Sequence, residues 1–110
     1  MTHTISLAVD FDGVIHKYTS PWTHAEEISD GPVEGAIDWI RLMLSQNVKI
    51  QIFTARLSGA PIGDEAPRDP YAIRAALVQW FVTHGLPEND VASLYFVRGK
   101  PHATLYIDDR

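Results

Sequence analysis

Apolar side chains follow two spacings along the chain, and each spacing predicts a different element. Short runs rich in β-branched residues are typical of buried strands. Such runs cover Ile5–Val9, Val48–Phe53, Val91–Val97 and Ala103–Ile107. Between them, apolar residues recur every three or four positions over 33–46 and over 71–84, which predicts two helices.

Capping residues support the two helices. Asp30 or Gly31 is expected to cap the first helix, with Pro32 in its first turn. Gly85 follows the second helix at the position where a left-handed residue often ends a helix. The boundaries therefore agree with the apolar spacing.

The order of these elements predicts the fold class. Strands that alternate with amphipathic helices are typical of an α/β fold with a mostly parallel sheet, here of four strands. The 110 residues amount to a single domain over 1–110. Ligands of such sheets bind at the carboxyl ends of the strands.

Two polar segments, 16–32 and 57–70, are expected to be loops. The first holds several rings, and two interpretations of them stay open. The rings of Tyr18 and Trp22, with His16 and His24, would contact substrate by stacking on a base or sugar. Alternatively they form a small apolar flap that packs on the body, the interpretation we favour.

Composition excludes several kinds of chemistry. The chain has no cysteine, so disulfides, zinc–thiolate sites and cysteine nucleophiles are excluded, and a cytoplasmic location is expected. The net charge of −5 is not that of a general nucleic-acid binder. We also expect no signal peptide and no membrane span.

Polar side chains gather where the predicted strands end. They are Asp10 and Asp12 after the first strand, Thr54 after the second, Lys100 in the turn before the fourth, and Asp108 and Asp109 after the fourth. If these strands are parallel neighbours, the side chains converge on one small volume. Neighbouring carboxylates repel one another, and a divalent cation relieves that repulsion. Oxygen ligands without His or Cys favour Mg²⁺, which would in turn attract phosphate.

These residues, in this order, resemble the haloacid dehalogenase (HAD) superfamily of Mg²⁺-dependent phosphohydrolases. The four matching motifs are Asp10-Phe11-Asp12-Gly13-Val14, Phe53-Thr54-Ala55-Arg56, Lys100 and Tyr106-Ile107-Asp108-Asp109-Arg110. They extend over positions 10 to 109, nearly the whole chain.

The resemblance implies a role for each catalytic residue. Asp10 would be the nucleophile and a metal ligand. Asp12 would be the general acid/base and would also bind the metal through its backbone carbonyl. Lys100 would hold the nucleophile and the phosphoryl oxygens, and Asp108 would bind Mg²⁺ directly, with Asp109 bound directly or through water.

The resemblance also implies a phosphate clamp formed by the Thr54 hydroxyl and the Ala55 amide. Arg56 would either contact the substrate phosphate or pair with an acid of the rim. The implied fold is a three-layer α/β/α Rossmann-like domain. The intervals 14–32 and 57–69 are too short for a folded cap domain, so this would be a capless member with an open site.

The implied activity is hydrolysis of phosphate monoesters through an aspartyl-phosphate. Substrates would be nucleotides, sugar phosphates or the phosphorylated end of a nucleic acid. The sequence stops one residue after the fourth motif, where the family usually continues. We therefore expect a minimal sheet, a partner subunit that covers the site or the sheet edge, or a truncated sequence.

Two other functions stay open. Receiver domains also combine acids, a threonine and a lysine at strand ends, but they carry the phosphoacceptor on the third strand, after an early acid pair. Here acid pairs begin and end the set, which fits a receiver poorly. A catalytically degenerate HAD fold that only binds a partner is the other alternative, although every expected catalytic residue type is present.

Overall fold

The computed structural model describes residues 5–57, 68–99 and 101–107. Four strands form one sheet, in the order β3-β2-β1-β4, and every neighbouring pair is parallel. The strands are β1 (Ser6–Asp10), β2 (Lys49–Phe53), β3 (Tyr95–Val97) and β4 (Leu105–Ile107). The expected α/β class with a parallel four-stranded sheet is confirmed.

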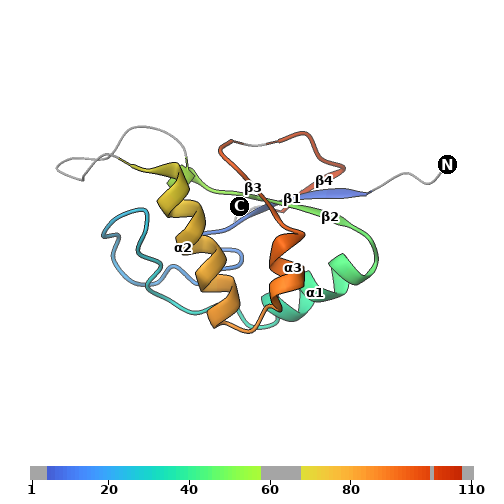
Figure 1. The fold of residues 1–110 in the computed structure, drawn as a ribbon, viewed down its shortest axis with the longest axis horizontal. Coiled ribbons are helices and arrows are strands. Elements are labelled where there is room, and N and C mark those ends of the chain that lie inside the picture. The colour runs from blue at the N-terminus through green and yellow to red at the C-terminus, as the bar shows by residue number, and fades with distance from the viewer. Residues whose placement is uncertain (1–4, 58–67, 100, 108–110) are drawn as a thin grey trace.

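The three α-helices of the described residues lie on one side of this sheet (Figure 1). They are α1 (Ala36–Ser45), α2 (Pro70–Thr83) and α3 (Glu88–Ala92), and a short 3₁₀ turn, η1 (Ala55–Leu57), follows β2. The chain steps from β1 to β2 to β3 in one direction across the sheet. Since crossovers between parallel strands are right-handed, two steps in the same direction put their helices on the same face.

The helix-covered face of the sheet carries the core. Alternation along a strand, with the register Leu7↔Ile50 and Val9↔Ile52, places these four side chains on that face. All four are buried. The helices close the core with Ile40, Ile73, Leu77, Trp80, Phe81 and Val91.

The other face of the sheet is crossed by the connection between β3 and β4. Ala8, Gln51 and Tyr106 lie side by side there in register. The Gln51 side-chain amide donates to the His102 carbonyl at 2.9 Å, and the Tyr106 hydroxyl donates to the Pro101 carbonyl. Among the described residues this connection, and no helix, lies over that face.

The predicted third strand over Val91–Val97 is wrong in its first half. Residues Glu88–Ala92 form α3, and β3 holds only Tyr95–Val97. Pro87, with φ −57°, stands at the N-cap, and the acidic side chains of Glu88 and Asp90 occupy the first turn. Acidic residues at a helix N-terminus complement its dipole, so these local signals favour a helical turn over the strand suggested by the apolar run.

The predicted start of the first helix is also wrong. Helix α1 begins at Ala36, and its N-cap is Gly35, whose φ of +83° few other residues adopt readily. The backbone N–H of Val33 instead donates to the Ile15 carbonyl at 2.7 Å. Asp30 and Gly31 therefore belong to the preceding loop rather than to a helix cap.

The second helix follows its prediction closely. Asp69 caps α2 through a 3.0 Å bond from the Tyr71 N–H, and Gly85 follows with φ +100°. No helix in the described part of the chain has both the length and the apolar character needed to cross a bilayer.

Candidate functional site

A pocket of about 470 Å³ opens at the carboxyl ends of β1 and β2. It is lined by Asp10, Asp12, Tyr18, Trp22, Ala55, Arg56 and Arg68. Asp10 is the last residue of β1 and pairs in register with Phe53, the last of β2. The loop after β1 and the turn after β2 therefore both line one cavity.

The structure brings several of the predicted site residues together. The Thr54 hydroxyl donates to Oδ2 of Asp12 at 3.4 Å and accepts the backbone N–H of Arg56 at 3.1 Å. Thr54 is almost fully buried, at 2% exposure. Its hydroxyl therefore belongs to the wall around Asp12 and also holds the first turn of η1.

The remaining predicted residues, Lys100, Asp108 and Asp109, lie outside the described residues. The structure does describe β4, the strand that directly precedes Asp108 and Asp109 in the sequence. Ile107, at the end of β4, pairs in parallel with Val9 of β1. Thus β1 has β2 on one side and β4 on the other, and both neighbours run in the same direction as β1.

Arg56 binds the Asp12 carboxylate through two nitrogens. Its Nε lies 3.0 Å from Oδ2, and its Nη2 lies 2.9 Å from Oδ1. The guanidinium is buried, and Nη1 donates to the carbonyls of Ala25 and Glu27 at 3.1 and 2.9 Å. A planar guanidinium suits this two-pronged contact with a carboxylate. Arg56 thus ties Asp12 to the middle of the same loop between β1 and α1, at Ala25 and Glu27.

His16 is the second partner of Asp12, and sequence reasoning did not identify it as such. It is fully buried, with Nδ1 2.9 Å from Oδ1 of Asp12. Its Nε2 accepts the backbone N–H of Asp30 at 3.0 Å. A ring nitrogen that accepts a hydrogen bond carries no proton, so the network assigns the proton of a neutral His16 to Nδ1, which donates to Asp12. The spacing of four residues between Asp12 and His16 was the only available signal.

These partners determine the ionisation of Asp12. Burial raises the pKa of its carboxyl group, but hydrogen bonds from His16 and Arg56, together with the charge of Arg56, outweigh burial and hold the pKa below the ordinary 3.8. At neutral pH Asp12 is therefore a carboxylate that accepts hydrogen bonds. That form can receive a proton, whereas donation of a proton is disfavoured in this arrangement.

Asp30 fixes the turn of the loop on the far side of His16. Its carboxylate accepts the backbone N–H groups of Thr19 and Ser20 at 2.9 and 2.8 Å and the Ser20 hydroxyl at 2.7 Å. The hydrogen bonds from Ser20 are the main reason that the pKa of Asp30 is lowered to about 2. The Asp30 carbonyl accepts the Trp80 indole N–H at 2.9 Å, which fastens the loop to α2.

The same turn holds Tyr18 in a left-handed backbone conformation, with φ +54°. Such a conformation costs a residue other than glycine about 1–3 kcal/mol, and it persists only where neighbouring contacts impose it. Residues held in this way are frequent at functional sites. The Tyr18 side chain is 43% exposed and lines the pocket, so this strained backbone holds an aromatic ring in the same pocket as Asp10 and Asp12.

The charge and oxygen atoms of the pocket limit which metal it could hold. Among the described residues, no group of three or more His, Cys, Asp or Glu side chains could hold a metal ion. The Asp12 carboxylate is already compensated by Arg56. The oxygen atoms that suit Mg²⁺ are therefore the Asp10 carboxylate and the Asp12 backbone carbonyl, to which Asp108 and Asp109 would have to be added.

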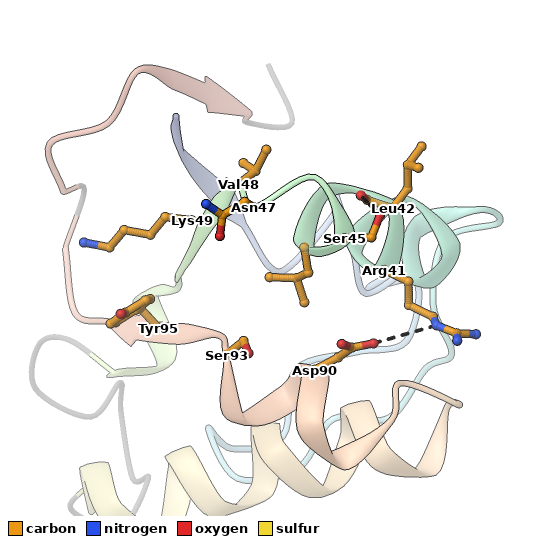
Figure 2. A pocket seen from close by; sticks show the side chains of 10 residues that line it. Arg41, Leu42, Ser45, Asn47, Val48, Lys49, Asp90, Ser93 and Tyr95 are labelled. Atoms are coloured by element: carbon orange, nitrogen blue, oxygen red, sulfur yellow. Dashed lines mark hydrogen bonds and ion pairs between the residues drawn. The ribbon is translucent and has the colours of Figure 1, made fainter. Parts of the chain in front are cut away.

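A larger hollow of about 950 Å³ lies at the other end of the sheet, where β2 and β3 begin (Figure 2). Its single carboxylate, on Asp90, lies 3.8 Å from Nε of Arg41. On its other side, Nζ of Lys49 lies 4.7 Å from the centre of the Tyr95 ring. Since its described lining residues include no acid pair, this hollow is less suited to phosphoryl chemistry than the smaller pocket.

Comparison of the sequence with known protein families and with curated proteins gave no match in either case. The chemistry of the pocket must therefore be argued from its own residues.

Proposed function

We propose that the chain is a Mg²⁺-dependent phosphatase of the HAD type, which hydrolyses phosphate monoesters through an aspartyl-phosphate. The observation that supports it most is the pocket itself. Asp10, which ends β1, and Asp12 line it together with Ala55 of the turn that follows the parallel neighbour β2, and the Thr54 hydroxyl of that turn donates to Asp12. An acid pair next to a hydroxyl and a backbone amide is suited to phosphoryl transfer.

In the proposed reaction the Asp10 carboxylate attacks phosphorus in line with the ester oxygen. The bond from phosphorus to that oxygen breaks, and the oxygen leaves as the alkoxide of the substrate's alcohol, which takes a proton from solvent. Water then attacks the phosphorus of the aspartyl-phosphate and Asp12 takes a proton from the water. The bond from phosphorus to the Asp10 oxygen breaks, inorganic phosphate leaves, and Asp12 returns its proton to solvent. The ionised state of Asp12 suits this second step, because a base must begin without the proton.

The other residues would orient the phosphoryl group. The Ala55 amide would donate to its oxygens, the Thr54 hydroxyl would turn from Asp12 to do the same, and Lys100 would neutralise its charge. Bound Mg²⁺, held by Asp10, the Asp12 carbonyl, Asp108 and Asp109, would supply the positive charge that draws two anions together. Arg56 is engaged with Asp12 and is assigned to that contact rather than to the substrate.

The proposal extends to the surroundings of the site. It includes the capless three-layer form of the fold and a homo-oligomer whose partner subunit covers the open site or the sheet edge. Substrates are phosphorylated small molecules or nucleic-acid ends, and the reaction takes place in the cytoplasm.

One observation favours a different function, namely a binding module without turnover. Both oxygens of Asp12 are already occupied by Arg56, so the general acid of the family has no obvious proton to give. A receiver-like domain would also keep its phosphoryl group on an aspartate. Both alternatives differ from a phosphatase in the number of phosphates released per chain.

The test is a phosphate-release assay with Mg²⁺ over p-nitrophenyl phosphate, nucleotides, sugar phosphates and phosphorylated oligonucleotides. A phosphatase releases many phosphates per chain, and Asp10→Asn abolishes release while the unfolding curve stays that of the native sequence. The matched control is Asp38→Asn, on an exposed turn of α1. Release limited to one phosphate per chain, or full activity of Asp10→Asn, would contradict the proposal.

A further inference from the structure

The pocket beside Asp10 has an aromatic wall for which the proposed phosphoryl chemistry has no use. Tyr18 and Trp22 line it from the loop after β1, and Arg68 lines it just before α2. Phosphate binding requires positive charge and hydrogen-bond donors, which the faces of aromatic rings do not supply. The wall therefore points to the part of the substrate that carries the phosphate.

Trp22 is fixed within this wall. The guanidinium carbon of Arg56 lies 4.9 Å from the centre of its ring, and that of Arg68 lies 5.7 Å from it. Arg68 is itself tied to the turn after β2, because its Nη1 donates to the Ala55 carbonyl at 2.8 Å. Cations near an indole ring are attracted to it, so these contacts hold the wall in place.

Tyr18 is the exposed part of the wall. Its ring meets the Trp22 ring edge to face, with centroids 6.5 Å apart and an angle of 81° between the planes. The backbone on both sides is held, since the Lys17 N–H donates to the Gly31 carbonyl at 3.0 Å and the Thr19 N–H donates to the Asp30 carboxylate. The loop thus holds a partly exposed ring at the pocket in a strained conformation.

We propose that this pocket takes a planar aromatic ring carried on the leaving-group side of the phosphate monoester, with Tyr18 as the residue that selects it. A cavity of about 470 Å³ is within the range of small-molecule sites. A planar ring gains contact with the face or edge of Tyr18 and with the guanidinium of Arg68, whereas an alkyl chain gains only buried area. This inference rests on the proposed function.

The experiment that tests it measures binding without turnover. Phenylphosphonate and ethylphosphonate carry the same phosphonate group, are not cleaved, and differ in the ring. Calorimetry with Mg²⁺ should give a dissociation constant about tenfold lower for phenylphosphonate, the size of one ring-stacking contact. Equal dissociation constants for the two phosphonates would overturn the inference.

Two substitutions assign the preference to Tyr18. Tyr18→Asn removes the ring and accepts a left-handed backbone more readily than tyrosine, so the fold is retained. It should bring the two dissociation constants together, whereas Tyr18→Phe keeps the ring and should keep the preference. Tyr95→Asn, which removes an exposed ring at the far end of the sheet, is the matched control and should change neither constant. A ring preference that survives Tyr18→Asn would also overturn the assignment.

A second pair of ligands identifies the source of the ring. Adenosine 5′-monophosphate and ribose 5-phosphate differ by a base that the sugar separates from the phosphate. Their binding to the Asp10→Asn chain, measured in the same way, shows whether a nucleobase or only a ring next to the phosphate is preferred.

The results also distinguish failure of the ring site from failure of the proposed activity. If phenylphosphonate is preferred and no ester is hydrolysed, the proposed phosphatase activity fails and the ring site stands. If all esters are hydrolysed equally well and the two phosphonates bind equally, the phosphatase activity stands and the ring site fails.

Discussion

The guanidinium of Arg56 spans both oxygens of Asp12, although 44 residues separate the two in sequence. The arginine is 2% exposed, and the aspartate side chain is 19% exposed. Loss of the arginine would leave a largely buried carboxylate without its charge partner and would free two backbone carbonyls of the loop.

We expect Arg56→Met to lower the free energy of unfolding by roughly 3–5 kcal/mol, the usual effect of breaking a buried ion pair from one side. Urea unfolding measures this. The control is Arg41→Met, in which an exposed arginine 3.8 Å from Asp90 is removed, with an expected loss below about 1 kcal/mol. Equal losses in the two variants would show that the Asp12 contact is no stronger than a surface pair.

The ionised state of Asp12 predicts how the rate depends on the leaving group. A general acid typically contributes about 10²–10⁴-fold to the rate, and Asp12 in its present contacts is a poor one. We therefore expect phenyl phosphate to be hydrolysed at least about 10²-fold faster than benzyl phosphate, because both carry the ring but only phenolate leaves readily without a proton. Comparable kcat values would mean that Asp12 is protonated when substrate is bound.

Asp30 provides a pH prediction with a defined sign. Its pKa in the folded chain is about 2, below the ordinary value of 3.8, so folding is stabilised above about pH 4 and this contribution disappears as the pH falls through 2. The lowered pKa of Asp12 acts in the same direction. Carboxyl titration by NMR should give about 2 for Asp30, and Ser20→Ala should raise that value by removing the hydroxyl donor. An unchanged titration in Ser20→Ala would contradict the assigned cause.

Removal of the metal should stop the reaction without unfolding the chain. We expect EDTA to suppress phosphate release and added Mg²⁺ to restore it, because the proposed nucleophile and the phosphate are both anions. The Asp12 charge is compensated by Arg56 without any ion, so the chain should remain folded in EDTA. Phosphate release that is indifferent to EDTA would count against the metal assignment.

The N-cap of α2 offers a test of a local structural feature. Asp69→Ala removes the acceptor for the Tyr71 N–H and should cost about 1 kcal/mol, whereas Asp69→Asn keeps an acceptor and should cost only a few tenths. Thermal unfolding of the two variants measures the difference. Identical melting temperatures would show that the cap contributes nothing.

The sheet could be predicted because its information is local. The apolar runs around Val9 and Ile52 mark β1 and β2 without knowledge of any distant residue, and right-handed connections then limit the topology. The 88–97 region failed for the same reason, since an apolar run of this length does not distinguish a strand from a helical turn followed by a shorter strand.

The contacts around Asp12 could not be predicted. Sequence spacing placed Asp12 at a strand end, but its carboxylate is bound by Arg56, which comes from the turn after β2. The sequence left two roles open for Arg56, namely contact with the substrate phosphate and pairing with an acid of the rim. His16 was interpreted as part of a loop. Its role depends on the Asp30 N–H reaching its second nitrogen, a contact across 14 residues that no periodicity reveals.

The pairing of β4 with β1 has a consequence for biosynthesis. The Thr104 N–H donates to the Ser6 carbonyl at 2.8 Å, across 98 positions of the chain. While only β1, β2 and β3 have emerged from the ribosome, the edge of β1 that will pair with β4 has no neighbouring strand. The nascent polypeptide must therefore wait for translation to reach Ile107 before its central strand is paired on both sides, and until then a chaperone or another unfinished chain can pair with it.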